Sequence, residues 1–183
     1  RLKPSFVVVC GDMVNEADSD EQIAEVKRIG ELLDHTIDLH WVPGNHDVAY
    51  DHNTPDQESL DRYRKNFGPD YYAFSHQDVR FIVINSTVLS SPKTMPDEEK
   101  AQLAFIEAEA SIAGHQNTKQ TIIFSHHPLF VESADVLPIG QAQQAFLTRG
   151  GRWKNHATAR DPRLRRMMPM PMHCPPGKLN KAS

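Results

Sequence analysis

Three short polar segments, each directly after an apolar run, most constrain how this chain can fold. The polar segments are residues 11–12, 44–47 and 125–128, and the apolar runs are 6–10, 37–42 and 121–124. In open α/β sheets, ligands bind just outside the carboxyl ends of the strands. If the runs are strands, the polar segments lie at the carboxyl ends of the strands, where ligands bind. We therefore expect them to form a functional site.

The remaining sequence alternates between strand and helix patterns. We expect strands at 6–10, 37–42, 71–74, 80–85 and 121–124, and helices at 20–34, 56–67 and 96–113. Residues 71–74 and 80–85 are close enough in the chain to form a hairpin. Asp18 or Ser19 can cap the first helix. This alternation predicts an α/β fold with mixed sheets.

Charge is unevenly distributed along the chain. From residue 149 onward there are nine Lys or Arg and one Asp, whereas residues 1–148 hold eleven Lys or Arg and twenty-three Asp or Glu. We therefore expect one partial domain over 1–148 and a basic, Pro- and Met-rich tail over 149–183. The tail has no apolar period, and we interpret it as a disordered segment or, preferably, as a spurious or unrelated terminus.

Composition excludes some classes of protein. With only Cys10 and Cys174 there is no disulfide framework and no cysteine cluster for structural zinc. No apolar stretch reaches the ~18–20 residues of a membrane span, so none is expected. The sequence leaves the compartment open; we favour the cytoplasm.

The polar segments contain side chains that can bind a metal ion. An Asp, an Asn and a His brought together offer two oxygens and one nitrogen, which suits Mn²⁺, Fe or Zn²⁺ better than a thiolate-seeking metal. Each segment alone also has a structural explanation, because Gly-Asp is a common turn and a His pair can pack at a strand end. Gly44-Asn45-His46-Asp47 is the most specific of the three.

Taken together and in order, the segments resemble the calcineurin-like metallophosphoesterase family, whose motifs are D-x-H, G-D, G-N-H-D/E, a His and G-H-x-H. The matching residues are Gly11-Asp12, Gly44 to Asp47, and His126, and the resemblance covers roughly residues 4–146. Stretches at 67–74, 81–86 and 123–133 are similar in particular to a serine/threonine phosphatase of this family.

The resemblance implies a fold of two mixed sheets packed face to face between helices, an αββα sandwich that we expect to be incomplete here. It also implies that Asp12 bridges two metal ions and that Asn45 and His126 bind the second. His46 would contact the phosphate and help to protonate the leaving alkoxide. Asp47 is placed to orient His46, as carboxylates orient other catalytic imidazoles.

The sequence also departs from the family pattern. It has no D-x-H before Gly11 and no G-H-x-H after His126, and the later His156 and His173 do not match. By the family pattern, one metal ion keeps a single protein ligand and the other keeps three. We therefore expect a fragment that lacks both ends of the metal site and holds at most one metal ion.

The leading hypothesis is metal-dependent hydrolysis of phosphate esters by a metal-activated hydroxide, with a phosphoprotein or a small phosphoester as substrate. We expect a phosphomonoesterase, potentially a protein serine/threonine phosphatase, and little or no activity from this chain itself. The alternative is a non-catalytic truncated product that binds a metal or a partner. A third interpretation, nucleic-acid binding, rests on the basic tail alone and is not expected.

Other polar residues are interpreted as structural. His127 is interpreted as a residue that lines the pocket rather than as a metal ligand. Five histidines in polar surroundings are expected at the surface: His35, His40, His52, His76 and His115. Four glutamates of the last helix are expected to form its solvated face: Glu98, Glu99, Glu107 and Glu109.

Overall fold

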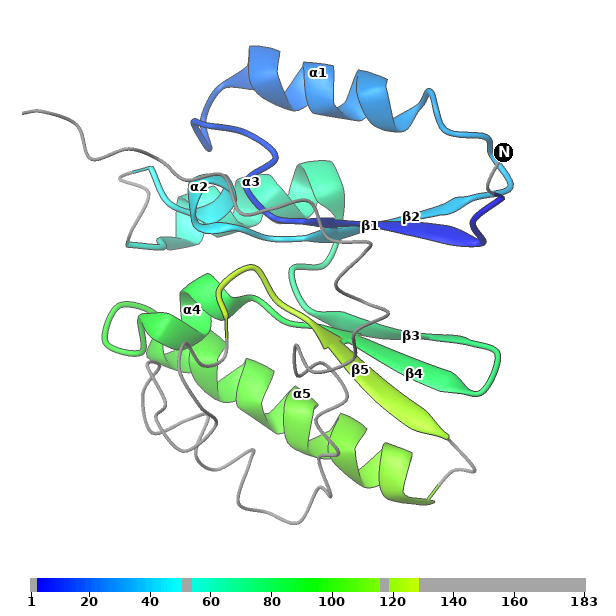
Figure 1. Cartoon of the computed structure of the whole chain (residues 1–183). Coiled ribbons are helices and arrows are strands. Elements are labelled where there is room, and N and C mark those ends of the chain that lie inside the picture. The colour runs from blue at the N-terminus through cyan, green and yellow to red at the C-terminus, as the bar shows by residue number, and fades with distance from the viewer. Residues whose placement is uncertain (1–2, 51–53, 116–118, 129–183) are drawn as a thin grey trace, which may run out of the picture. The chain divides into compact units, whose positions relative to one another are not determined.

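A computed structural model describes residues 3–50, 54–115 and 119–128 of the chain (Figure 1). Its elements, in order, are β1 (Phe6–Cys10), α1 (Asp20–Gly30), β2 (Asp38–Val42), α2 (Asn45–Val48), α3 (Gln57–Phe67), β3 (Tyr72–His76), β4 (Val79–Val83), α4 (Ser86–Ser90), α5 (Pro96–His115) and β5 (Gln120–Phe124). The expected tail over 149–183 and the boundary at 148 lie outside the described residues.

The strands form two separate sheets. β1 and β2 pair in parallel, with Phe6 opposite Asp38 and Cys10 opposite Val42. In the other sheet, the order is β3-β4-β5: β3 and β4 form the expected antiparallel hairpin, and β4 pairs in parallel with β5. The predicted α/β class with mixed strand directions is therefore confirmed.

Aromatic rings fill the space between the two sheets. The Phe6 ring of β1 lies 5.4 Å from Phe74 of β3 and 5.1 Å from Phe81 of β4, measured between ring centroids. The imidazole of His40 stacks on Phe74 at 3.6 Å. The prediction that His40 lies at the surface was wrong, because a five-residue strand beside β1 turns this side chain toward the opposite sheet.

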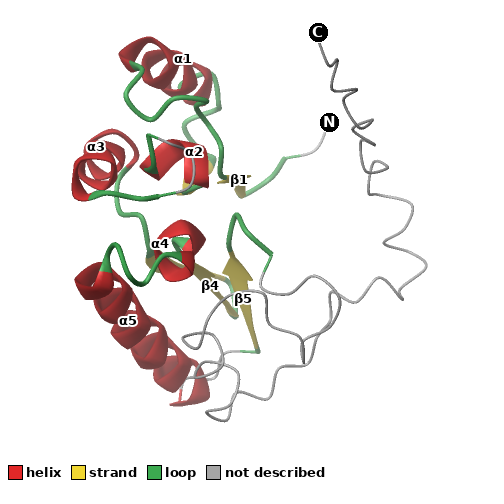
Figure 2. Cartoon of the chain, turned by 90° about the vertical axis from the view of Figure 1, so that its left-hand side faces the viewer, coloured by secondary structure: helices red, strands yellow, loops and turns green. Residues whose placement is uncertain are grey.

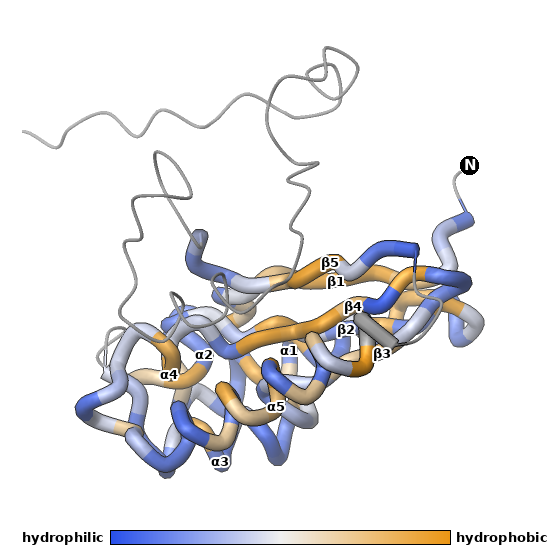
Figure 3. Tube along the Cα trace, turned by 90° about the horizontal axis from the view of Figure 1, so that it is seen from below, coloured by the Kyte–Doolittle hydropathy of each residue, from blue (hydrophilic) through white to orange (hydrophobic). Residues whose placement is uncertain are grey.

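Helices cover the outer sides of the sheets. α1 lies outside the β1-β2 sheet and α5 outside the β3-β4-β5 sheet, giving the order helix, sheet, sheet, helix (Figure 1, Figure 2). Hydrophobic segments concentrate in the strands, whereas the helices mix hydrophobic and hydrophilic residues (Figure 3). Ile82 and Ile84 pack with Ile106 of α5, which fixes that helix against the sheet.

The start, buried face and end of the helix α3 agree with the prediction from its sequence. Asp56 caps it by accepting a hydrogen bond from the Ser59 amide at 2.8 Å. Leu60 and Tyr63 share one helix face and are almost completely buried. Gly68, at φ 91°, ends the helix in a conformation that a side chain would disfavour.

The helix α1 is shorter than predicted. Ser19 is the cap, as one of the two expected residues, but the helix ends at Gly30 rather than at residue 34. Gly30 lies so close to β2 that a Cβ atom there would come within 3.0 Å of the Leu39 side chain. Leu32 and Leu33 leave the helical face, and Leu32 is 72% exposed.

The interpretation of the glutamates of α5 as a solvated face was wrong for two of them. Glu109 is buried, and its carboxylate accepts two hydrogen bonds of 2.8 Å from the Arg80 guanidinium of β4. Glu98 is partly buried and accepts two from Arg64 of α3, at 2.8 and 2.7 Å. Arginines on neighbouring elements therefore draw these carboxylates inward.

Candidate functional site

The three polar segments meet in the fold, as the sequence predicted. Because β1 and β2 run in parallel, the segments after Cys10 and Val42 leave the same edge of their sheet. The segment after β5 joins them: His126 Nε2 lies 3.2 Å from Asn45 Oδ1 and 3.3 Å from Asp12 Oδ2. Asp12, Asn45 and His126 thus form one cluster, which we call the Asp-Asn-His cluster.

Two glycines make this close approach sterically feasible. A Cβ on Gly11 would lie 2.4 Å from His126 Nδ1, and a Cβ on Gly44 would lie 2.3 Å from Asp12 Oδ1. Gly11 also has a φ of 81°, and Asp12 follows it with a φ of 51°. An Asp tolerates this left-handed conformation better than most residues, so the turn after β1 can aim the carboxylate into the cluster.

The imidazole of His126 is held in one orientation. Its Nδ1 lies 3.0 Å from the carbonyl oxygen of Cys10, at the end of β1. A carbonyl can only accept, so Nδ1 carries the hydrogen, and Nε2 of the neutral ring presents a lone pair. Backbone acceptors at the remote nitrogen are typical of histidines that bind a metal through the other nitrogen.

The cluster fits a divalent cation. Nε2 of His126 lies against Oδ1 of Asn45 and Oδ2 of Asp12, and in a neutral ring with the hydrogen on Nδ1 all three atoms present lone pairs. Such a set is stable only with a proton or a cation between its members. One carboxylate, one amide oxygen and one imidazole suit Mn²⁺, Fe or Zn²⁺. The cluster has only two residues of the usual metal-binding types, Asp12 and His126, and within the described part of the chain no group of three or more His, Cys, Asp or Glu could hold a metal ion.

Asp47 connects two of the site segments. Its carboxylate is 3% exposed and accepts hydrogen bonds from the amides of Gly44 at 2.7 Å, Met13 at 2.8 Å and Val14 at 3.1 Å. Burial raises the pKa of the Asp47 carboxyl, and the three amide hydrogen bonds oppose that rise. Asp47 therefore fixes the loop after β1 against the loop after β2.

His46 lies at the rim of the cluster. Its amide donates to Asp12 Oδ1 at 3.2 Å, and its Nδ1 lies 3.0 Å from the carbonyl oxygen of Asn15. The Asn15 carbonyl therefore orients this ring. The expectation that Asp47 orients His46 stays a prediction.

Sequence reasoning did not identify Ser86 as part of the site region. Ser86 begins α4, a short helix that was not predicted, and its Oγ lies 3.0 Å from both the amide nitrogen and the Nδ1 of His127. Asn85 followed by Ser and Thr is a helix-capping pattern that could have indicated α4. The contact itself pairs residues 41 positions apart, so no local pattern could have indicated it.

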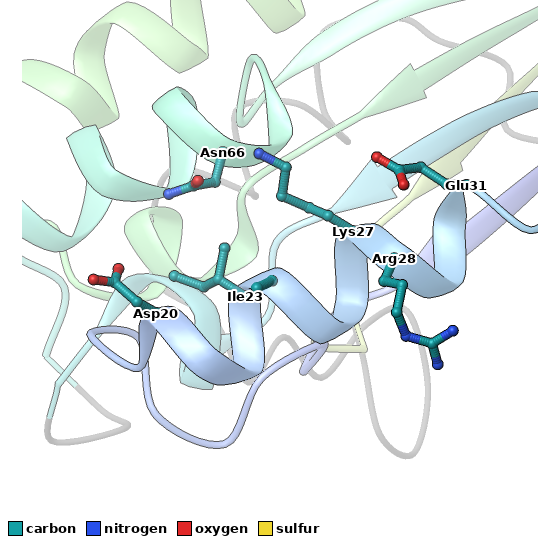
Figure 4. A pocket seen from close by; sticks show the side chains of 7 residues that line it. Asp20, Ile23, Lys27, Arg28, Glu31 and Asn66 are labelled. Atoms are coloured by element: carbon teal, nitrogen blue, oxygen red, sulfur yellow. The ribbon is translucent and has the colours of Figure 1, made fainter.

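A surface hollow of about 330 Å³ lies elsewhere, along α1 and facing Asn66 of α3 (Figure 4). Its other lining residues are Asp20, Ile23, Ala24, Lys27, Arg28 and Glu31. Asp20 and Arg28 are engaged in ion pairs with Arg62 and Glu25. None of the predicted site residues lines this hollow.

No helix among the described residues is long and apolar enough to cross a bilayer.

Comparison with known proteins gives a consistent set of relatives. The sequence model of the calcineurin-like phosphoesterases matches residues 1–156. The chain is similar to serine/threonine-protein phosphatase CPPED1 of Pongo abelii and of Homo sapiens, at 36% and 35% identity over 137 residues. The Danio rerio protein of the same name is 28% identical. These matches cover 73% of this chain but only 43% of each relative.

Proposed function

Because the chain belongs to the calcineurin-like phosphoesterase family, we propose that it acts on phosphate esters through the Asp-Asn-His cluster. The family resemblance seen in the sequence motifs is thereby confirmed. Since the chain spans less than half the length of the curated relatives it matches, their activity is extended to it here as a proposal.

The observation that carries the proposal is the convergence of three lone-pair atoms from three separate strand ends. Asp12, Asn45 and His126 would hold one divalent cation, each through the atom that already faces the others. When bound, a divalent cation polarises a phosphate oxygen and lowers the pKa of water, which supplies a nucleophile near neutral pH. Asp12 is 38% and His126 20% exposed in their side chains, so a ligand can reach them.

The neighbouring residues have supporting roles in this proposal. His46 contacts the phosphate at the rim of the site and donates a proton to the leaving alkoxide, with its ring oriented by the Asn15 carbonyl. Asp47 keeps the loops that carry Asp12 and Asn45 in register, through its three amide hydrogen bonds. Both roles depend on the turn that begins at Gly44.

For the substrate, we propose a phosphomonoester of serine or threonine. The support is the printed name of the relatives, serine/threonine-protein phosphatase, together with the open, partly exposed position of the cluster. A small phosphoester is the competing substrate within the same chemistry.

The test is metal-dependent phosphate release by the full 183-residue chain. Hydrolysis of a phosphothreonine peptide and of p-nitrophenyl phosphate is measured with Mn²⁺, Zn²⁺ or a chelator. Any turnover should require metal and fall by at least about a hundredfold in Asp12→Asn and His126→Ala, because loss of a residue that only orients a metal ligand already costs roughly 10–100-fold. Asp18→Asn and His35→Ala are the matched controls on exposed residues. Metal-independent turnover, or equal rates in the site variants, would contradict the proposal.

A second candidate function is metal or partner binding without turnover. It is favoured by the donor count, because the described residues bring together three ligands, enough for one cation rather than two. Isothermal titration separates the two functions. One-equivalent metal binding that disappears in His126→Ala, without phosphate release, would support this candidate over catalysis.

A further inference from the structure

Ser86 lies directly behind the segment that carries His126. Its side chain is fully buried, at 0% exposure. Its Oγ accepts a hydrogen bond from the His127 amide at 3.0 Å and lies 3.0 Å from His127 Nδ1. A hydroxyl can accept at one lone pair and donate its hydrogen to a ring nitrogen at the same time. One small side chain therefore fixes both the backbone and the ring of His127.

The position of Ser86 is itself rigidly determined, because Asn85 is held on all its polar groups. The Asn85 amide donates to Gln102 Oε1 at 2.7 Å, and its carbonyl accepts from Gln102 Nε2 at 3.2 Å. Its Nδ2 donates to Asp70 at 2.9 Å, and its Oδ1 caps α4 through the amides of Thr87 and Val88. Asn85 and Gln102 are both completely buried, so water does not compete for these bonds.

Strand pairing places Asn85 and Ser86 beside the segment that carries His126. Val83 of β4 lies opposite Phe124 of β5, and the Ile84 amide donates to the Phe124 carbonyl at 3.0 Å. The chain segments after the two strands therefore leave the sheet together. Figure 1 shows the segment after β5 passing beside α4. Its own Ser125 hydroxyl closes a tight turn by donating to the His127 carbonyl at 2.9 Å.

We propose that Ser86 is a positioning residue for the metal ligand His126. By holding His127, it fixes the turn after β5 so that Nε2 of His126 faces Asn45 and Asp12. The hydrogen bonds of the Ser86 side chain go to His127 and not to the Asp-Asn-His cluster, so Ser86 acts through the turn. The effect of Ser86 on metal binding rests on the proposed function, but its effect on the turn after β5 can be tested without a metal ion.

The first experiment measures hydrogen exchange at the amides of Ser125, His126 and His127 by NMR in the metal-free full chain. Ser86→Ala should accelerate exchange at His127 by about tenfold, the factor for losing one ordinary hydrogen bond. Ser86→Cys keeps the size of the side chain with a poor hydrogen-bonding group and should change exchange in the same direction. The matched control is Ser90→Ala in the same helix, whose Oγ donates to the Thr87 carbonyl at 2.8 Å. Unchanged exchange at His127 in both Ser86 variants would overturn the proposal.

The second experiment titrates Mn²⁺ and Zn²⁺ into the same proteins by calorimetry. Ser86→Ala should weaken metal binding by about tenfold, the lower end of the range for residues that orient metal ligands, while Ser90→Ala should not. Equal affinities in wild type and Ser86→Ala would overturn the positioning role. If the wild type binds no metal, the proposed function fails, whereas the exchange data still decide whether Ser86 holds the turn.

Discussion

At the scale of single residues, Asp47 illustrates how one carboxylate can organise a site without belonging to the proposed metal ligands. Its two oxygens receive three amide hydrogens from two loops that lie more than thirty positions apart in the chain. Those loops carry Asp12 and Asn45. A side chain of this kind acts on the geometry of the cluster by fixing the backbone on either side of it.

We expect Asp47→Asn to destabilise the chain by about 1–3 kcal/mol. The Asn side chain has one oxygen where the carboxylate has two, so at least one buried backbone amide loses its acceptor. The NH₂ group of the Asn side chain also faces other hydrogen-bond donors. Urea denaturation followed by circular dichroism measures the effect, with Asp18→Asn at an exposed position as the control. A midpoint for Asp47→Asn equal to that of the control would show that the three hydrogen bonds contribute nothing to stability.

At the scale of elements, Arg64 connects α3 with α5 and with the segment that precedes β3. Its Nε donates to the buried Asp70 at 2.7 Å, and its terminal nitrogens bond both oxygens of Glu98. These hydrogen bonds lower the pKa of the Glu98 carboxyl. Asp70 in turn accepts from Asn85, so the same network reaches α4 and the segment behind the site. Packing of hydrophobic faces places the helices, and this network fixes how they sit relative to each other.

Replacing Arg64 with Ala should lower the free energy of unfolding by about 2–3 kcal/mol. The loss leaves Asp70, 2% exposed, with a charge that Asn85 only partly compensates. Arg28→Ala is the matched control, because Arg28 forms a similar two-point pair with Glu25 on the exposed side of α1. Chemical denaturation of both variants should show a clear decrease for Arg64→Ala only. A larger effect of the Arg28 change would contradict this account of the network.

At the scale of the whole described domain, the two sheets share an aromatic layer that contains a titratable group. The ring of His40 stacks on Phe74 and lies 5.9 Å from the Tyr72 ring, and its partial burial lowers the pKa of the imidazole. The folded state therefore favours the neutral ring. In the unfolded chain, His40 binds a proton near its ordinary pKa of ~6.5, whereas in the folded chain the imidazole binds a proton only at a lower pH. Stability from this group is complete above that pH and is lost as the pH falls through the lowered folded pKa.

We accordingly expect acidification from pH 8 to pH 5.5 to destabilise the wild type more than His40→Phe. The phenyl ring keeps the stack and removes the titration. The Tyr72 hydroxyl retains its hydrogen bond to the Trp41 carbonyl at 3.2 Å. Thermal unfolding across this pH range measures the difference, and His35→Gln, at a side chain 95% exposed, should behave like wild type. Parallel pH profiles for His40→Phe and wild type would contradict a neutral, half-buried His40.

The sequence was most informative where local pattern and tertiary environment agree. The strands and long helices follow from apolar runs and from caps such as Ser19 and Asp56. Asp12, Asn45 and His126 were identified as a set because each follows an apolar strand. The parallel pair β1 and β2 brings Asp12 and Asn45 to one edge, whereas His126 follows β5 of the other sheet. Their roles as ligands stay predictions, but their proximity is a feature of the fold.

Other features were decided only by the tertiary structure. His40 and Glu109 look like surface residues in the sequence. The partial burial of His40 and the burial of Glu109 depend on which ring or guanidinium a neighbouring element presents. The helix α1 ends at Gly30, which lies close against β2, and no helical period shows that contact. Ser86 meets His127 through strand pairing and an unpredicted short helix. Periodicity and capping act within a few residues and are written in the sequence, whereas partners of polar side chains depend on which distant segments the packed sheets bring together.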